Sequence, residues 1–488
     1  MTTMKQIILS LLLLSTNCII LGQNAEDALR YSIYNNYSTA RVTSLGGSFG
    51  ALGGNIGGVT TNPATLGIYR TDEITVTFSS DNENIESKYL SEPSVNTDRY
   101  KFFMQNLSYI KSTPIESDWN RINMSINFNR LRDLDRQIHI SGYNEGSSMI
   151  NDFFLQDAQG TYYEDLNYFN GTASAYWTDL IDLTDDETND IYFSNLESSN
   201  TGQNQELRIE ETGYINELGF TCSGAYKDFL FLGLSINLLD IDFSQHKSYT
   251  EYNFDEINDL QSFTYNTDLQ VNGDGTNFKI GAIIKPTPSI RIGWAYHSKN
   301  YLSLYETYTS DMAADFTNFT NIDYFDYNLD GQRDVDEEFY DIQTPIKTIS
   351  SLAVVFAKKG LISFDYETID YGTARFEPNT YYSFASDNLD ISTFYAKTNN
   401  IRVGLEWKLK KLTLRSGYAI YGSPFENKIN DASREYMSVG VGFQNEQYFI
   451  DIAMIQSIEE EDYILYNNEF ATLYNNGTTI MISCNYKF

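Results

Sequence analysis

Six residues between 326 and 337 have the side chains and the spacing to bind a divalent cation. Counted from Asp326, they occupy positions 1, 3, 5, 7, 9 and 12, and Gly331 occupies position 6. This is the spacing of an EF-hand calcium loop, in which position 7 contributes its backbone carbonyl. The residues are Asp326, Asn328, Asp330, Gln332, Asp334 and Glu337. We expect them to hold a structural Ca²⁺ ion that stiffens the loop.

General acidity gives a second interpretation of the same loop. Residues 310–341 contain ten carboxylates and one cationic side chain, so a match to the calcium spacing can arise without binding. Arg333 stands at position 8, where an apolar residue is usual, and no clear helix pair flanks the loop. Calcium binding and a solvated acidic loop both stay open on the sequence alone.

No other residues form a recognisable catalytic or cofactor site. The three histidines, His139, His246 and His297, are scattered, and none lies near a serine or cysteine that it could activate. Cys222 and Cys484 lack the Cys and His neighbours of a zinc or nucleophile site. We therefore expect no enzyme and no required cofactor. An enzyme acting on lipids is disfavoured because it would need a nucleophile.

The most unusual stretch of backbone is residues 44–69, which contains eight of the 31 glycines. Glycine allows left-handed turns and close backbone contacts. No Gly-x-Gly-x-x-Gly or Gly-Lys-Ser/Thr motif is present, so a nucleotide site is excluded. We expect a compact plug rather than an ordinary glycine-rich surface loop. Within it, Asn62 is expected to satisfy backbone groups and Pro63 to fix a bend before Ala64.

The N-terminal segment and the composition narrow the class of protein. Residues 1–22 have a lone lysine, an apolar run and small residues before Gln23, as in a secretory signal peptide. No later run of eighteen apolar residues could form a spanning helix. The net charge of −33 argues against nucleic-acid and anionic-lipid partners, which need a basic surface. Aromatic residues make up 15% of the chain, which suits a membrane β-barrel.

Apolar and polar residues alternate with the period of a β-strand in many segments. Fourteen strands are predicted, at 71–80, 100–112, 119–130, 209–226, 228–246, 276–285, 289–309, 342–357, 361–376, 397–410, 411–422, 433–444, 447–458 and 476–488. Short turns and long polar loops alternate strictly between them, and the largest loop is about 131–208. This asymmetry is typical of an outer-membrane barrel, whereas a soluble β-sandwich gives no reason for it.

We therefore predict an all-β protein, a 14-stranded antiparallel transmembrane β-barrel in the bacterial outer membrane. Residues 1–22 are the signal peptide, 23–70 a hatch inside the lumen, and 71–488 the barrel with long extracellular loops. An even strand count places both termini in the periplasm. The last strand ends in Phe488, which resembles the signal that such barrels present to their insertion machinery.

Several segments resemble the FadL/TodX family of outer-membrane hydrocarbon transporters, in the form found in Bacteroidota. These are residues 27–32, the segment from Ala40 to Gly54, Asn62-Pro63-Ala64, and further stretches at 360–367, 401–406 and 414–418. The sequence departs from the family at Thr65, where a glycine commonly follows Asn-Pro-Ala. No motif maps the ligand-contacting residues of the family onto this chain.

The resemblance implies that the barrel binds long-chain fatty acids or aromatic hydrocarbons and releases them sideways into the membrane. A lateral exit avoids moving an apolar solute into water, which costs about 0.8 kcal/mol per methylene. The alternative is a non-transporting scaffold, an accessory subunit of an outer-membrane secretion or assembly machine. The acidic, tyrosine-rich loop at 131–208 would suit such a protein partner.

Overall fold

A computed structural model describes residues 25–184, 190–196, 202–255, 259–317, 322–325, 335–356, 359–380, 383–426, 430, 432–467 and 469–488. The predicted signal peptide, residues 1–22, lies outside these ranges. Within them, no helix is both long enough and apolar enough to cross a membrane.

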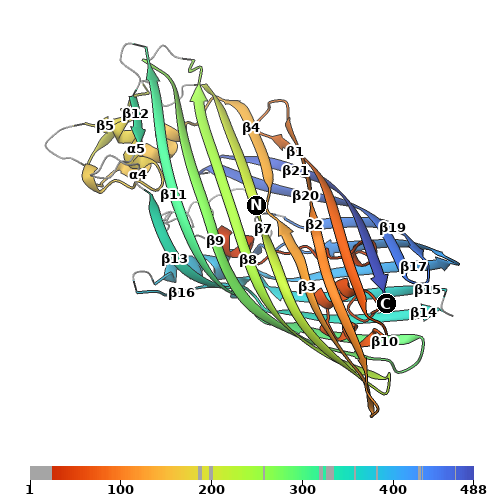
Figure 1. Cartoon of the computed structure of the whole chain (residues 1–488). Helices are drawn as coiled ribbons and strands as arrows, with labels where there is room; N and C mark the ends of the chain where they lie inside the picture. The colour runs from red at the N-terminus through yellow and green to blue at the C-terminus, as the bar shows by residue number, and fades with distance from the viewer. Residues whose placement is uncertain are drawn as a thin grey trace, which may run out of the picture.

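The described residues form a closed antiparallel β-barrel of 14 strands, which confirms the predicted fold (Figure 1). The first strand, β1, pairs along its whole length with the last, β21. Three of the 14 strands are interrupted, so each is counted once with its continuation. The strands are β1 (Glu73–Lys88), β2 (Val95–Pro114), β3 (Trp119–Asp133) continued by β4 (Arg136–Asn144), β7 (Gln203–Tyr226), β8 (Leu230–Tyr252), β9 (Leu260–Ile284), β10 (Ile290–His297) continued by β11 (Tyr301–Phe316), β13 (Asp336–Gln343) continued by β14 (Lys347–Phe356), β15 (Gly360–Asp370), β17 (Lys397–Leu409), β18 (Leu412–Tyr421), β19 (Arg434–Gln444), β20 (Tyr448–Tyr466) and β21 (Glu469–Lys487).

Alternation along each strand sorts side chains between the two faces of the wall. In β8, Leu234 and Ile236 are exposed on the outside, whereas Ser235 and Asn237 are buried on the inside. Because a lipid-facing surface must be apolar, the outer face carries aliphatic and aromatic residues. The inner face can be polar wherever backbone or another side chain satisfies it.

Several strands extend beyond their predicted ends. β9 begins at Leu260 rather than 276, and the predicted loop 459–475 is largely a hairpin of β20 and β21. The predicted loop 131–208 is also shorter, because β4 ends at Asn144 and β7 begins at Gln203. Above the apolar band both faces of a strand contact water or polar groups, so alternation no longer marks it.

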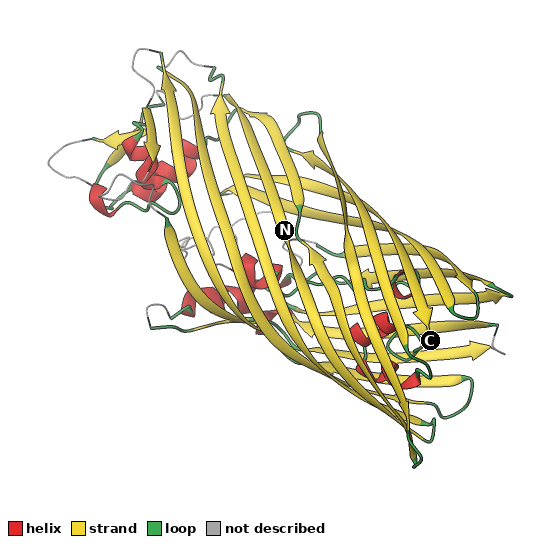
Figure 2. Cartoon of the chain, viewed as in Figure 1, coloured by secondary structure: helices red, strands yellow, loops and turns green. Residues whose placement is uncertain are grey.

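The lumen is filled at one end by the segment before β1. Its elements are α2 (Ala25–Arg30), α3 (Ala40–Thr43), and two short 3₁₀ helices, η1 (Ile56–Thr60) and η2 (Pro63–Ile68). Figure 2 shows short helices surrounded by strands close to the C-terminus of the chain. We call the described residues 25–70 the hatch.

The other end of the lumen is covered by a lobe within the long loop between β4 and β7. It contains η3 (Ile150–Phe154), α4 (Leu155–Ala158), η4 (Tyr163–Asp165), α5 (Thr172–Trp177) and the small ribbon β5 (Ile181–Leu183) with β6 (Tyr192–Ser194). Phe154 is fully buried against Phe263 and Tyr265 of β9. The remaining short elements are β12 (Ile322–Phe325), η5 (Tyr371–Thr373), β16 (Arg375–Glu377) and α6 (Ala385–Phe394).

Candidate functional site: a hatch beside a lateral gap

The Asn62-Pro63-Ala64 motif begins η2 and joins the hatch to the wall. The Asn62 side chain caps η2, because its Oδ1 accepts a hydrogen bond from the backbone N–H of Ala64 at 3.0 Å. Its Nδ2 donates to the carbonyl of Gly50 at 2.7 Å. Pro63 stands at the first position of η2, where no N–H is needed. One side chain therefore satisfies backbone groups of two hatch segments.

Glycines of the wall lie directly under the hatch backbone. A Cβ added at any of six inward positions would come closer than 3.0 Å to hatch atoms. These positions are Gly233, Gly281, Gly293, Gly404, Gly417 and Gly440. At Gly417 the clash would be with the backbone of Leu45 and Gly46, so neither surface could move away cheaply. Glycine in the hatch and glycine in the wall together allow backbone-to-backbone packing.

An ion-pair chain fixes the hatch from one side. The guanidinium of Arg41 contacts both carboxylate oxygens of Glu406 on β17, at 2.9 and 3.1 Å. Glu406 also accepts from Arg415 of β18, which in turn donates to Asp451 of β20 at 2.7 Å. Burial alone would lower the pKa of Arg41, but the Glu406 carboxylate raises it above its ordinary value. Arg41 therefore stays charged.

A second carboxylate binds the hatch backbone directly. Asp365 Oδ2, on β15, accepts hydrogen bonds from the N–H groups of Phe49 and Gly50 at 3.0 and 3.1 Å. Arg402 of β17 is fully buried beside it and donates to Glu367 at 3.1 Å. Charged hydrogen bonds in a water-poor interior are among the stronger polar contacts. The hatch is thus a fixed part of the lumen.

The barrel wall itself is incomplete between β2 and β3. These strands pair from Pro114 and Arg121 as far as Asn106 and Asn129, and no further. Beyond that point residues 95–104 of β2 pair with β1. The end of β3 and all of β4 pair with β7. The wall therefore has a lateral gap, which we define as the region between residues 95–105 of β2 and 130–144 of β3 and β4.

Side chains, and not backbone ladders, span this lateral gap. Lys101 Nζ of β2 contacts Asp133 Oδ1 at 2.9 Å, and Arg99 Nη1 contacts Asp135 Oδ2 at 3.0 Å. Gln105 Nε2 donates to the Arg130 carbonyl at 2.6 Å. We call the four charged residues, Arg99, Lys101, Asp133 and Asp135, the latch. Their side chains are 10 to 24% exposed.

The bend that opens the gap has a local cause in β7. Gly213 lies opposite the break between β3 and β4, with φ of +147°. Its N–H donates to Asp135 Oδ1 at 2.7 Å, and its carbonyl accepts from Leu134 N–H at 3.1 Å. A side chain at this position would meet the backbone of Asp242. Glycine here allows β3 to turn away from β2.

Behind the gap, the lumen holds an apolar cluster beside the buried charges of Arg30 and Arg132. Buried side chains from β3, β7, β8, β9, β11 and β13 surround the start of the hatch, including Leu131, Ile215, Phe243, Leu302 and Ile342. The hatch reaches the gap as well, since Arg132 Nη1 donates to the Arg30 carbonyl at 2.9 Å. On the outer surface the aromatic rings of Tyr100 and Phe102 are 74 and 70% exposed. An apolar cluster on the inside and apolar rings on the outside therefore lie on the two sides of the charged latch.

The predicted calcium ligands are mostly outside the described residues. Asp326, Asn328, Asp330, Gln332 and Asp334 lie there, and Glu337 lies in β13 opposite Thr307. Among the residues that the structure describes, no group of three or more His, Cys, Asp or Glu side chains could hold a metal ion.

The histidines and the terminal residue have separate contacts. His297 Nε2 lies 2.9 Å from the Thr61 carbonyl of the hatch, so one of the three histidines contacts the candidate site. His139 pairs with Glu206, and His246 with Asp268, both on the wall. Phe488 N–H donates to the Asp72 carbonyl, and its ring stacks on Tyr109 of β2.

Comparison with known proteins identifies the family. Residues 209–484 match the family model for outer membrane protein transport proteins (OMPP1/FadL/TodX). The chain belongs to this family. FadL/TodX proteins are outer-membrane transport channels and not enzymes, which confirms two expectations from the sequence. No curated protein matches the chain.

Solved structures of FadL/TodX proteins share the fold at low sequence identity. A Pseudomonas aeruginosa FadL homologue has a TM-score of 0.59 and 12% identity, covering 94% of this chain and 100% of that one. The P. putida toluene transporter TodX has a TM-score of 0.52 and 13% identity, with 93 and 99% covered. The Ralstonia pickettii toluene transporter TbuX has a TM-score of 0.51 and 12% identity, with the same coverage.

Proposed function

We propose that this protein takes up hydrophobic small molecules, such as long-chain fatty acids or aromatic hydrocarbons, and releases them sideways through the lateral gap. The observation that carries this proposal is the loss of backbone pairing between β2 and β3 beside an apolar cluster in the lumen. The toluene transporters TodX and TbuX share the fold. The hatch closes the straight route through the lumen with buried polar anchors.

The physical advantage of a lateral route is that the apolar cargo never has to enter water. An eight-carbon chain that left the apolar lumen through water would lose about 6 kcal/mol at roughly 0.8 kcal/mol per methylene. Once the latch has opened, passage through the gap takes the cargo from the apolar cluster to lipid without crossing bulk water. Opening the gap breaks side-chain contacts, while the ladders on its two sides, β1–β2 and β4–β7, can persist.

A cross-link across the gap tests the route. Thr97 and Gln137 face each other there, since the Thr97 hydroxyl donates to the Gln137 carbonyl at 2.8 Å. In a protein with Cys222 and Cys484 replaced by serine, Thr97→Cys with Gln137→Cys is joined by a short thiol-reactive linker. Uptake of a fluorescent fatty acid or of radiolabelled toluene into proteoliposomes is then measured.

We expect uptake to stop on cross-linking and to return when a cleavable linker is reduced. The control pair is Glu210→Cys with His246→Cys, which are direct partners in the continuous ladder of β7 and β8. Linking these two residues should leave uptake unchanged. Full uptake through a cross-linked gap would refute lateral release. Stoichiometric protein partners without any bound hydrophobe, after purification from native membranes, would favour the scaffold function instead.

We also propose that both termini and the short turns face the periplasm, and that the Phe488 strand is recognised by the insertion machinery. The connections at one end of the barrel have two to five residues, and the longest loops, including residues 145–202, all lie at the other end, which supports the orientation. An impermeant maleimide added to intact cells should label Glu164→Cys, in the lobe, and leave Asp228→Cys, in a short turn, unlabelled. Labelling of Asp228→Cys alone would reverse the assignment.

For the acidic loop we propose a structural calcium ion, supported by the spacing of its oxygen ligands. Asp330→Ala should abolish any calcium-dependent rise in thermal stability and any calcium protection from proteolysis within residues 310–341. Glu338→Ala, next to the ligand set but outside it, is the control. If wild-type protein responds to calcium no differently from Asp330→Ala, the site does not exist.

A further inference from the structure

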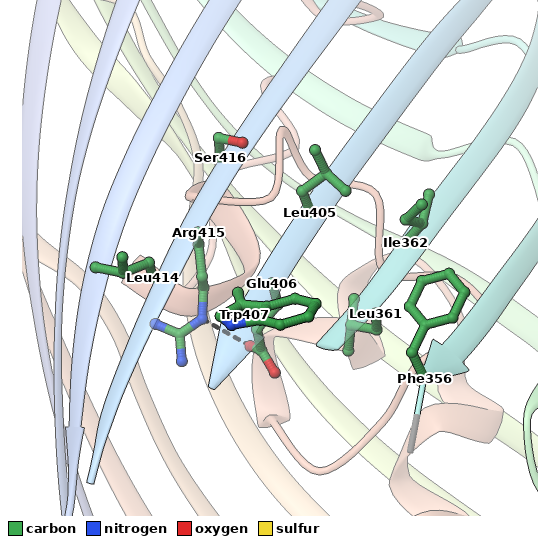
Figure 3. A pocket seen from close by; sticks show the side chains of 9 residues that line it. All are labelled: Phe356, Leu361, Ile362, Leu405, Glu406, Trp407, Leu414, Arg415 and Ser416. Atoms are coloured by element: carbon green, nitrogen blue, oxygen red, sulfur yellow. Dashed lines mark hydrogen bonds and ion pairs between the residues drawn. The ribbon is translucent and has the colours of Figure 1, made fainter. Parts of the chain in front are cut away.

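A hollow of about 430 Å³ lies on the wall near the short-turn end of β14, β15, β17 and β18. Its outward-facing lining is Phe356, Ile362, Leu405, Trp407, Leu414 and Ser416, and the paired charges of Glu406 and Arg415 lie at its base with Leu361 (Figure 3). The small residues Gly360 and Ser416 lie opposite Trp407 and Leu405 in the ladders. This pairing of small with large side chains leaves a recess between the rings and the aliphatic groups.

Exposed lysines border this hollow. They lie in or beside the turns that connect the four strands, and they are Lys359, Lys408, Lys410 and Lys411. The two turns touch, because the N–H of Lys408 donates to the carbonyl of Lys359 at 2.6 Å. Lys359 N–H donates in turn to the carbonyl of Phe356, which lines the hollow. The turns that carry these cations therefore adjoin the residues that line the recess.

These lysines differ from Lys111 and Lys227, which stand at other short turns, and resemble Lys285, whose Nζ lies over the Phe231 ring. Lys111 pairs with Asp72 at 2.6 Å, and Lys227 pairs with Asp118 at 3.2 Å. Among the described residues, none of the four lysines beside the hollow has a carboxylate within 4.0 Å. Lys408 Nζ contacts only the neutral side chain of Gln444, at 2.9 Å. Glu406, the acid on the same strand, is already neutralised by Arg41 and Arg415.

We propose that this surface binds an anionic phospholipid of the surrounding membrane, with its acyl chain in the hollow and its phosphate at the four lysines. The hollow faces the lipid side of the wall, so the available apolar occupant is an acyl chain. Trp407, 53% exposed at the edge of the apolar band, stands where tryptophan favours the headgroup boundary. The overall charge of −33 opposes anionic partners, but screening limits that repulsion to about 8 Å at physiological salt.

The position of Trp407 gives a direct assay. Trp119→Phe, Trp177→Phe and Trp294→Phe together leave Trp407 as the one tryptophan, because the chain has four. The full-length barrel is reconstituted in phosphatidylcholine vesicles that contain a small fraction of brominated lipid. Bromine quenches tryptophan on contact, so quenching by brominated phosphatidylglycerol relative to brominated phosphatidylcholine reports the headgroup preference at the hollow.

We expect brominated phosphatidylglycerol to be preferred about fivefold, the worth of roughly one lysine near an anionic headgroup. The preference should disappear in the Lys359, Lys408, Lys410 and Lys411 to alanine variant and survive in Lys111→Ala with Lys227→Ala. Folding of each variant is checked by gel electrophoresis, in which the unboiled, folded barrel migrates faster than the boiled sample. A protein that keeps only Trp294, which lies outside the hollow, should show no preference.

A second variant keeps the test independent of the lysines. Ser416→Phe fills the hollow from the lipid side and should reduce quenching of Trp407 by both brominated lipids, with the lysines intact. Equal quenching by the two headgroups in the wild-type background would overturn the proposal. So would a preference for phosphatidylglycerol that persists after the four lysines are removed.

Discussion

Neutralising one carboxylate of the latch should accelerate lateral release. Asp133 is the partner of Lys101 at 2.9 Å and of Arg99 at 3.6 Å. Two opposite charges 4 Å apart attract by about 4 kcal/mol at an effective dielectric of 20. Separating them to about 8 Å, as an open gap requires, halves that attraction and costs roughly 2 kcal/mol for each pair.

Asp133→Asn removes most of this cost on one side of the gap. Because Asp135 still pairs with Arg99 at 3.0 Å and with Lys101 at 2.5 Å, the loss is partial, and we expect a gain of about 1.4 kcal/mol in opening, which is about tenfold in the open population. The assay is the initial rate of fatty-acid uptake into proteoliposomes. Asp133→Glu, which keeps the negative charge opposite Lys101 and Arg99, should leave the rate close to that of the wild type.

A matched control uses an ion pair outside the gap. Asp72→Asn breaks the contact with Lys111 at the short turns and should leave uptake unchanged. If Asp133→Asn inserts as a folded barrel and its uptake is unchanged or slower, opening of the gap does not limit transport. If Asp133→Glu raises uptake as much as Asp133→Asn does, the latch does not act through charge attraction.

Three further predictions concern the hatch. Gly417→Ala forces a Cβ against Leu45 and Gly46 and should lower the free energy of unfolding by about 1 to 3 kcal/mol. The loss should appear as a lower thermal midpoint and as faster proteolysis of the hatch. Gly146→Ala, whose Cβ would meet nothing within 4 Å, is the control. Arg41→Ala should destabilise by about 2 kcal/mol and raise leakage of small solutes, whereas Arg70→Ala, from an exposed pair with Asp228, should change neither by a measurable amount. Asn62→Ala should cost about 1 to 2 kcal/mol, because η2 loses its cap and the Gly50 carbonyl its donor. Asn62→Asp should lie between the two, and equal stability of all three proteins would contradict the assigned contacts.

The strand count was predictable because each crossing of the apolar band forces alternation over several residues. The hatch was recognisable because eight glycines within residues 44–69 are hard to place in strands. Both features are local in sequence. The ends of β9 and β20 were missed because outside the band neither face needs to be apolar.

The gap was not predictable, because it depends on register between strands far apart in the chain. Nothing near Gly213 marks it as the residue opposite the end of β3, and Asp133 and Asp135 look like ordinary loop acids. The six wall glycines are spread over 208 positions, from Gly233 to Gly440. Their common relation to the hatch exists only in the closed barrel. A search for glycine at inward positions of predicted strands is the signal that could have found them.

The contacts of the hatch impose an order on assembly. The N–H of Ala40 donates to the hydroxyl of Ser483, 443 residues later in the chain, and other hatch groups meet strands from β8 to β19. The hatch docking site therefore does not exist until the last strand has been synthesised and has paired with the first. The N-terminal segment must wait undocked through almost the whole of translation and export. Its richness in glycine suits that wait, because glycine has no side chain through which to associate prematurely.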